Sequence, residues 1–163
     1  MRLLPALLFA LVQSPSAAQI QIVKDWGADT NVDVNNAYPR NLIQHEGFLY
    51  FVSQSPEHGQ ELWRSDGTEQ GTVLVKDIRT GPQGSMPLNP QFTSAGGLLY
   101  FRADDGISGL ELWRTDGTED GTYLTKDIMS GQQTSNVAGL VELNGRVVFR
   151  AFNGVSWQVW VSD

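Results

Sequence analysis

Residues 111–128 read Glu-Leu-Trp-Arg-Thr-Asp-Gly-Thr-Glu-Asp-Gly-Thr-Tyr-Leu-Thr-Lys-Asp-Ile, and nearly the same phrase occurs 50 residues earlier, at 61–78. A shorter copy, Gln-Val-Trp-Val-Ser-Asp, stands at 158–163. Self-similarity at a fixed period indicates a repeat architecture built from one small supersecondary unit. We interpret the shared positions as structural: Glu61, Trp63, Asp66, Gly67 and Thr68, then Glu111, Trp113, Asp116, Gly117 and Thr118, and finally Trp160.

Each unit also contains short segments that are rich in β-branched and aromatic residues. In the second unit they lie around 90–95 and at 98–103, 110–115 and 122–128, and glycine, asparagine and aspartate bound them. Segments so close in sequence pair as antiparallel neighbours, because a parallel crossover needs more chain. The sequence therefore predicts an all-β fold of tandem four-stranded antiparallel sheets. The repeats are expected at 41–78, 90–128 and, in part, 139–163.

Four-stranded units of this length favour the blades of a β-propeller, with a stacked β-solenoid as the alternative. Residues 19–26 match the fourth segment of the later units, so this strand could pair with the last unit and close a ring. Three units are fewer than the roughly four to eight blades of a propeller. We expect an incomplete ring, either a piece of a longer chain or a partner in self-association that completes the ring.

The repeated phrases resemble the bacterial ELWxxDGT repeat family. Both copies keep the Glu-Leu-Trp-x-x-Asp-Gly-Thr pattern, at 61–68 and 111–118, and the similarity extends over residues 20–163. The resemblance implies a secreted or surface-exposed bacterial protein with tandem propeller-like repeats, and it implies no activity. The third copy departs from the pattern, because Gln158 replaces the glutamate and Val161 the arginine.

The N-terminus has the features of a secretory signal peptide over residues 1–18. Arg2 is followed by an apolar run and by the small residues Ser16-Ala17-Ala18, and the mature chain is expected to begin near Gln19. No later segment is apolar enough to span a membrane. The formal net charge of −7 disfavours nucleic-acid partners, because backbone phosphates require a basic face. No Lys/Arg run occurs that could bind an anionic membrane surface.

Two kinds of side chain are candidates for ligand binding. The three tryptophans at the repeated position are predicted to pack between units, whereas Trp26 and Trp157 fall outside that position and could bind a ligand. Alternating oxygen donors at Asp29, Asn31 and Asp33 are candidates for a Ca²⁺ site, and Asp104 and Asp105 are a second candidate pair. Turn formation is the favoured explanation of both groups.

No catalytic residue is predicted. The two histidines, His45 and His58, are expected to be exposed loop residues, and no nucleophile elbow, phosphate loop or zinc pair occurs. We therefore expect a non-catalytic binding or adhesion scaffold whose partner is an extracellular protein or a carbohydrate. The alternative is a fragment of an extracellular propeller enzyme, such as a glycoside hydrolase or lyase.

Overall fold

The computed structural model describes Val23 and residues 38–162, and these residues form eleven β-strands and no helix. The strands are β1 (Arg40–His45), β2 (Phe48–Ser55), β3 (Gly59–Ser65), β4 (Val73–Lys76), β5 (Thr93–Ala95), β6 (Leu98–Asp104), β7 (Leu110–Thr115), β8 (Tyr123–Lys126), β9 (Ala138–Leu143), β10 (Arg146–Phe152) and β11 (Trp157–Ser162). The predicted strand segments of the second unit agree with β5 to β8 to within a few residues.

The strands form three antiparallel sheets, each made from one repeat. Sheet 1 has the order β1-β2-β3-β4, sheet 2 the order β5-β6-β7-β8, and sheet 3 the order β11-β10-β9. The prediction of an all-β fold with four-stranded antiparallel units is thus confirmed for the first two repeats. The predicted strand at 19–26 lies outside the described residues, apart from Val23.

The repeats share their register as well as their strand order. Phe51 is paired with Trp63 in sheet 1, Phe101 with Trp113 in sheet 2, and Phe149 with Trp160 in sheet 3. These pairs align the second and third strands of the three sheets position by position. The third strand of sheets 1 and 2 also carries the same register shift just before its tryptophan, where it pairs with the fourth strand.

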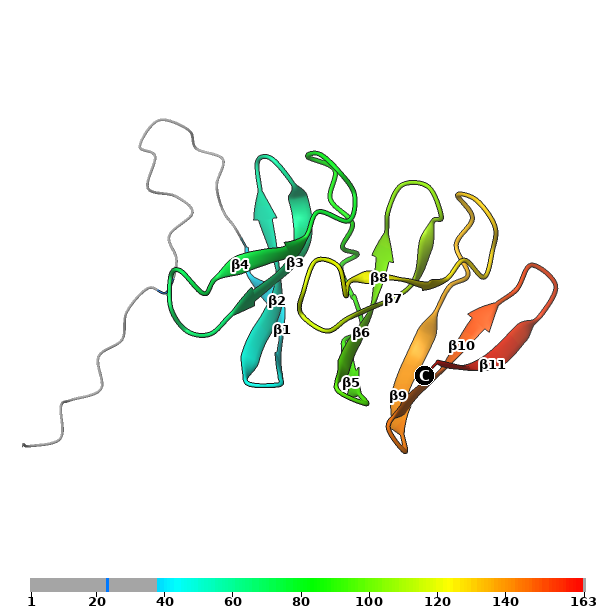
Figure 1. Cartoon of the computed structure of the whole chain (residues 1–163). Helices are drawn as coiled ribbons and strands as arrows, with labels where there is room; N and C mark the ends of the chain where they lie inside the picture. Colours follow the sequence, from blue (N-terminus) through cyan, green and yellow to red (C-terminus); the bar gives the residue numbers. More distant parts are fainter. Residues whose placement is uncertain (1–22, 24–37, 163) are drawn as a thin grey trace, which may run out of the picture.

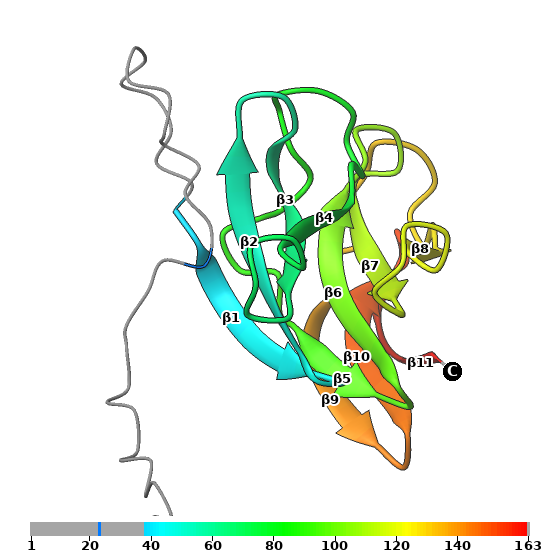
Figure 2. The same ribbon diagram turned by 60° about the vertical axis from the view of Figure 1, so that its left-hand side comes forward.

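The three sheets stand in a row and pack through their faces (Figures 1 and 2). One core cluster joins sheet 1 to sheet 2 and contains Tyr50, Val52 and Leu62 together with Leu99, Phe101, Ala103 and Trp113. A second cluster joins sheet 2 to sheet 3 and contains Tyr100, Leu112, Val147, Phe149 and Ala151. Because successive side chains of a strand point to opposite faces, β6 serves both clusters.

The connections divide between the two ends of the sheets. The β2–β3, β6–β7 and β10–β11 turns lie at one end, together with the linkers that lead from one sheet to the next (Figure 1). The tight β1–β2, β5–β6 and β9–β10 turns lie at the other end (Figure 1). We call the first of these ends the linker end, because it carries the longer connections.

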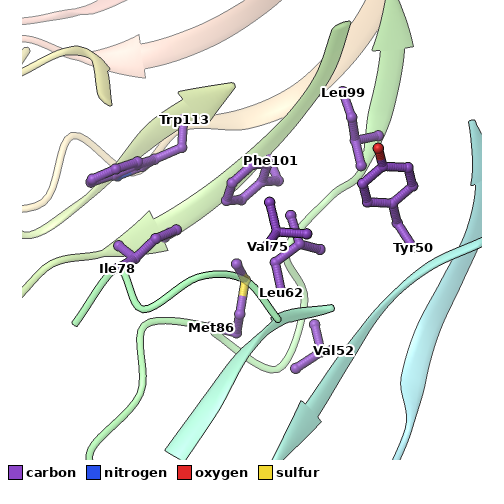
Figure 3. Packing of buried hydrophobic residues seen from close by; sticks show 10 residues of the cluster. Tyr50, Val52, Leu62, Val75, Ile78, Met86, Leu99, Phe101 and Trp113 are labelled. Atoms are coloured by element: carbon purple, nitrogen blue, oxygen red, sulfur yellow. The ribbon is translucent and has the colours of Figure 1, made fainter. Parts of the chain in front are cut away.

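Three polar side chains of sheet 1 clamp the β7–β8 turn of sheet 2. The Lys76 ammonium Nζ donates to the carbonyl oxygens of Thr122, at 2.8 Å, and Glu119, at 3.3 Å. Tyr50 and Arg64, which face each other across β2 and β3, lie over Gly117 of the same turn. The buried Tyr50 ring also packs beside Leu99, as Figure 3 shows. The turn of one repeat is therefore held by the repeat before it.

We predict that Gly117→Ala destabilises the protein more than Gly67→Ala does. Both glycines have left-handed φ angles, +92° and +91°, so alanine is strained at either position by about 1 kcal/mol or more. A Cβ at Gly117 would overlap the Tyr50 hydroxyl and lie 3.0 Å from Arg64 Nη1, whereas a Cβ at Gly67 meets nothing within 4 Å. The overlap is expected to add about 1–3 kcal/mol, measured as the free energy of unfolding in urea. Equal losses for the two variants would show that the clamp does not form.

Candidate functional site

The most unusual charged groups are two buried carboxylates at one repeated position. Glu61 on β3 and Glu111 on β7 have no exposed surface. Glu61 Oε1 accepts the backbone N–H of Arg79 at 3.1 Å, and its Oε2 accepts the Ser85 hydroxyl at 2.5 Å. Glu111 Oε1 likewise accepts the N–H of Ser135 at 3.1 Å and that of Met129 at 3.4 Å, and its Oε2 accepts the Ser135 hydroxyl at 2.5 Å. Each carboxylate therefore ties the linker that leaves its sheet.

The linker serines extend this tie to the following sheet. The carbonyl oxygen of Ser85 accepts the N–H of Asp104 on β6 at 3.0 Å, and that of Ser135 accepts the N–H of Phe152 on β10 at 2.7 Å. Asp104 and Phe152 occupy matching positions of their sheets. Each serine thus bridges a glutamate of one sheet to the backbone of the next. Sequence analysis missed both serines, although each lies 24 residues after its glutamate.

Burial changes the acidity of these carboxyl groups. Desolvation raises the pKa of Glu61 to about 7, against the lowering effect of the bonds from Ser85 and Arg79. Desolvation also raises the pKa of Glu111. Lys76 does not pair with Glu61, because its ammonium donates to the β7–β8 turn.

The Asp-Gly-Thr stretch forms the same turn in both full repeats. Asp66 Oδ1 accepts the N–H of Thr68 at 2.9 Å and its hydroxyl at 2.7 Å, and Asp116 makes the matching bonds to Thr118 at 2.8 and 2.6 Å. The hydroxyl bond is the main cause of the lowered pKa of both aspartates. These carboxylates are turn-forming groups at the surface.

The repeated tryptophans lie inside the molecule. Trp63 and Trp113 are buried, and the Trp113 side chain lies next to Ile78 in the cluster between sheets 1 and 2 (Figure 3). Trp160 is partly buried and packs against the cluster between sheets 2 and 3. The three indole rings therefore do not gather around a common pocket.

The linker end carries polar residues that the second repeat replaces, because Ser108 matches His58 and Met129 matches Arg79. His58 Nδ1 lies 2.9 Å from Asp77 Oδ2, and Arg79 Nη1 lies 3.6 Å from Asp104 Oδ2. Arg79 and Asp104 line a hollow between the first linker and the β6–β7 turn, together with Gln132 from the second linker. Both ion pairs are partly exposed, so each stabilises the fold by less than about 1 kcal/mol.

The Ca²⁺ candidates Asp104 and Asp105 are used as turn acceptors. Asp104 Oδ1 accepts the N–H of Gly106, and Asp105 Oδ1 accepts the N–H groups of Ile107 and Ser108. Among the described residues, no three His, Cys, Asp or Glu side chains are grouped to hold a metal ion. The other candidates, Asp29, Asn31 and Asp33, lie outside the described residues.

The expectation that both histidines are exposed was wrong for His45. This side chain is 3% exposed, its Nδ1 lies 2.8 Å from the Ser94 hydroxyl, and its ring stands 5.7 Å from that of Tyr50. His45 ends β1, and sheet 2 covers it. A strand-end histidine gives no sign of this burial in the sequence, because the covering sheet is contributed by residues about 50 positions further on.

Of the two tryptophans proposed to bind a ligand, Trp157 is described and Trp26 is not. Trp157 begins β11 and is 54% exposed. Its ring lies 5.8 Å from that of Phe152, and the Arg150 guanidinium lies 5.2 Å from the indole centroid. An exposed indole held by a second ring and a cation forms a rigid apolar platform.

Comparisons with protein-family models, with curated proteins and with solved structures found no match for this chain. The described part of the chain contains no helix with the length and apolar character needed to cross a membrane.

We predict that Glu61→Gln removes part of the pH dependence of stability. The folded pKa of about 7 exceeds the ordinary value of 4.5, so the folded state binds more protons than the unfolded state between these values. The free energy of unfolding of the wild type should therefore fall as pH rises from 4.5 to 7, by up to about 3 kcal/mol from this group. The glutamine variant should lose that slope, whereas Glu69→Gln in an exposed turn should keep it, as measured by urea unfolding at each pH. A wild-type slope that persists in Glu61→Gln contradicts the assignment.

Proposed function

We propose that this protein is a non-catalytic binding scaffold, secreted or held at a cell surface, whose partner is an extracellular protein or carbohydrate. The observation that carries this proposal is the use of the repeated buried acids. Glu61 and Glu111 are bonded to linker atoms on both carboxylate oxygens and have no exposed surface. These two recurring acids therefore hold the fold together.

The sheets are, in this proposal, consecutive blades of a β-propeller. Support comes from the four antiparallel strands of sheets 1 and 2, from the face-to-face row of sheets, and from the repeated glutamate–serine bridge between neighbours. The resemblance to the ELWxxDGT repeats and the signal-peptide features at residues 1–18 support export.

The linker end is the proposed binding surface. Polar side chains there change between the first two repeats, as His58 and Arg79 illustrate, while the core positions stay alike. Loops on a rigid scaffold are where binding residues concentrate in proteins generally. Trp157, next to the β10–β11 turn, is the exposed aromatic residue best placed for contact with a sugar ring or an apolar side chain.

A propeller enzyme of the glycoside hydrolase or lyase type is the second candidate, and the raised pKa of Glu61 is the observation that favours it. Catalytic acids are often carboxyl groups whose pKa is raised by burial. A glycosidase, however, needs two carboxyl groups that face the substrate. The Glu61 side chain is enclosed, and linker atoms occupy both of its oxygens, which favours the scaffold.

We predict that Trp157→Ala weakens binding by about tenfold or more, because an exposed tryptophan is a frequent hot spot at interfaces. The full chain would be applied to an array of polysaccharides and to immobilised extracellular proteins, and its affinity for each retained partner measured by surface plasmon resonance. Leu143→Ala, which alters an exposed apolar residue beside the tight β9–β10 turn at the other end of the sheets, is the matched control and should bind like the wild type.

The same samples test the alternative function. Binding without release of new reducing ends or unsaturated products supports the scaffold. Turnover of a retained polysaccharide that disappears in Glu61→Gln would establish the enzyme instead. Failure to retain any polysaccharide or protein would contradict both proposals.

A further inference from the structure

The outer face of sheet 1, which faces away from sheet 2, contains an apolar hollow of about 270 Å³. Its walls are formed by Val23, Leu42 and Leu49, and its lining includes Ser65, Gly67 and Thr72 near the β3–β4 turn. Leu49 is 38% exposed here, whereas Leu99, its counterpart in sheet 2, is completely buried. The two sheets thus differ in what covers this position.

In sheet 2 the matching place is filled by a tyrosine. The shared register places Leu99, Thr115 and Gly117 where sheet 1 has Leu49, Ser65 and Gly67. Tyr50 of sheet 1 packs beside Leu99 (Figure 3). Its hydroxyl lies over Gly117. Val75 belongs to the cluster that covers this position in sheet 2. Val23, which matches Val75 in the sequence, lines the hollow on sheet 1.

The β3–β4 turn beside the hollow carries the same acidic side chain as the β7–β8 turn. In sheet 2, the Asp116 carboxylate lies close enough to Arg64 for the cation to lower its pKa, although Thr118 is the larger cause. Sheet 1 carries Asp66 at that position, in the same turn geometry, and Arg64 of its own sheet also lowers the pKa of this carboxylate, after the larger effect of Thr68. A partner that presents a phenol ring and a guanidinium to this face could contact sheet 1 in the way that Tyr50 and Arg64 contact sheet 2.

We propose that this hollow is a socket for the tyrosine side chain of a protein partner, presented on a β-sheet with an arginine directly opposite it on the neighbouring strand. Tyr50 and Arg64 are such a cross-strand pair. The proposal does not depend on the function proposed above, because it concerns the outer face of sheet 1 and not the linker end.

A second copy of this chain is a poorer occupant than such a partner. The outer face of sheet 3 is apolar and exposed, with Val159 at 79%, and could in principle stack on sheet 1. At the positions of Tyr50 and Arg64, however, sheet 3 carries Val148 and Val161, which are paired with each other. Valine is too short to reach the β3–β4 turn, and it offers no partner for Asp66. Sheet stacking by a second copy would therefore leave the socket unfilled.

The test uses p-cresol, which is the tyrosine side chain without its backbone, and the full chain labelled with ¹⁵N. In the wild type, p-cresol should produce saturable shifts of the amide signals of Leu49, Ser65 and Gly67. Gly67→Ala places a methyl group where the phenol hydroxyl would lie, as the overlap of a Cβ at Gly117 with Tyr50 shows. The Gly67→Ala variant should bind p-cresol at least about tenfold more weakly than the wild type does.

Gly47→Ala is the matched control. Gly47 also has a left-handed φ, +82°, and open space around it, but it lies in the β1–β2 turn, outside the socket. It should share the loss of stability and keep the wild-type affinity for p-cresol. Absence of saturable shifts in the wild type, or equal weakening in both variants, would overturn the proposal. So would a dimer in sedimentation that is lost in Val159→Asp and that blocks p-cresol, because the third sheet would then be the occupant.

Discussion

The structure depends on one constraint, which is that a buried carboxylate must have every oxygen satisfied. Glu61 and Glu111 are buried within the sheets. A charge or hydrogen-bond acceptor without a partner there would lower the free energy of unfolding by roughly several kcal/mol. The linkers supply the missing donors through backbone N–H groups and a serine hydroxyl. The path of each linker is fixed as a result, and with it the point at which the chain enters the next sheet.

The same constraint explains how the sheets follow one another. Ser85 and Ser135 accept a backbone N–H of the following sheet while they donate to the glutamate of the preceding one. The apolar clusters then supply the driving force for stacking, and the clamp of Lys76 on the β7–β8 turn adds a polar contact at the opposite side of the interface. Directional hydrogen bonds and non-directional burial of apolar side chains therefore act together at both interfaces between the sheets.

Sequence reasoning went furthest where local chemistry decides the structure. The segments rich in β-branched and aromatic residues, the glycine, asparagine and aspartate residues that bound them and the repeat itself predicted the strands, and the short connections predicted their antiparallel pairing. The Asp-Gly-Thr turn was predictable because its bonds connect residues that are neighbours in the chain. Glu61 could be recognised as structural by its recurrence, but its burial could not, because the donors come from a linker with no fixed secondary structure. His45 was misjudged for the same reason, since a different sheet buries it.

The hollow on sheet 1 and its tyrosine-filled counterpart illustrate a further limit. The sequence aligns Leu49 with Leu99 and Gly67 with Gly117, but it does not say which face of each strand meets a neighbour. Only the packing of Tyr50 against sheet 2 reveals the role of these positions. In a repeat protein, the interface between two neighbouring sheets therefore indicates which side chains the outer face of the first sheet can accept.

Native-state hydrogen exchange of the linker amides tests the central claim most directly. The N–H groups of Arg79 and Ser135 belong to linkers without regular secondary structure, yet each donates to a buried glutamate. The account predicts that both exchange as slowly as the amides of β3 and β7 and open only with the sheets themselves. Exchange of these two amides at the rate of exposed loop residues would contradict it.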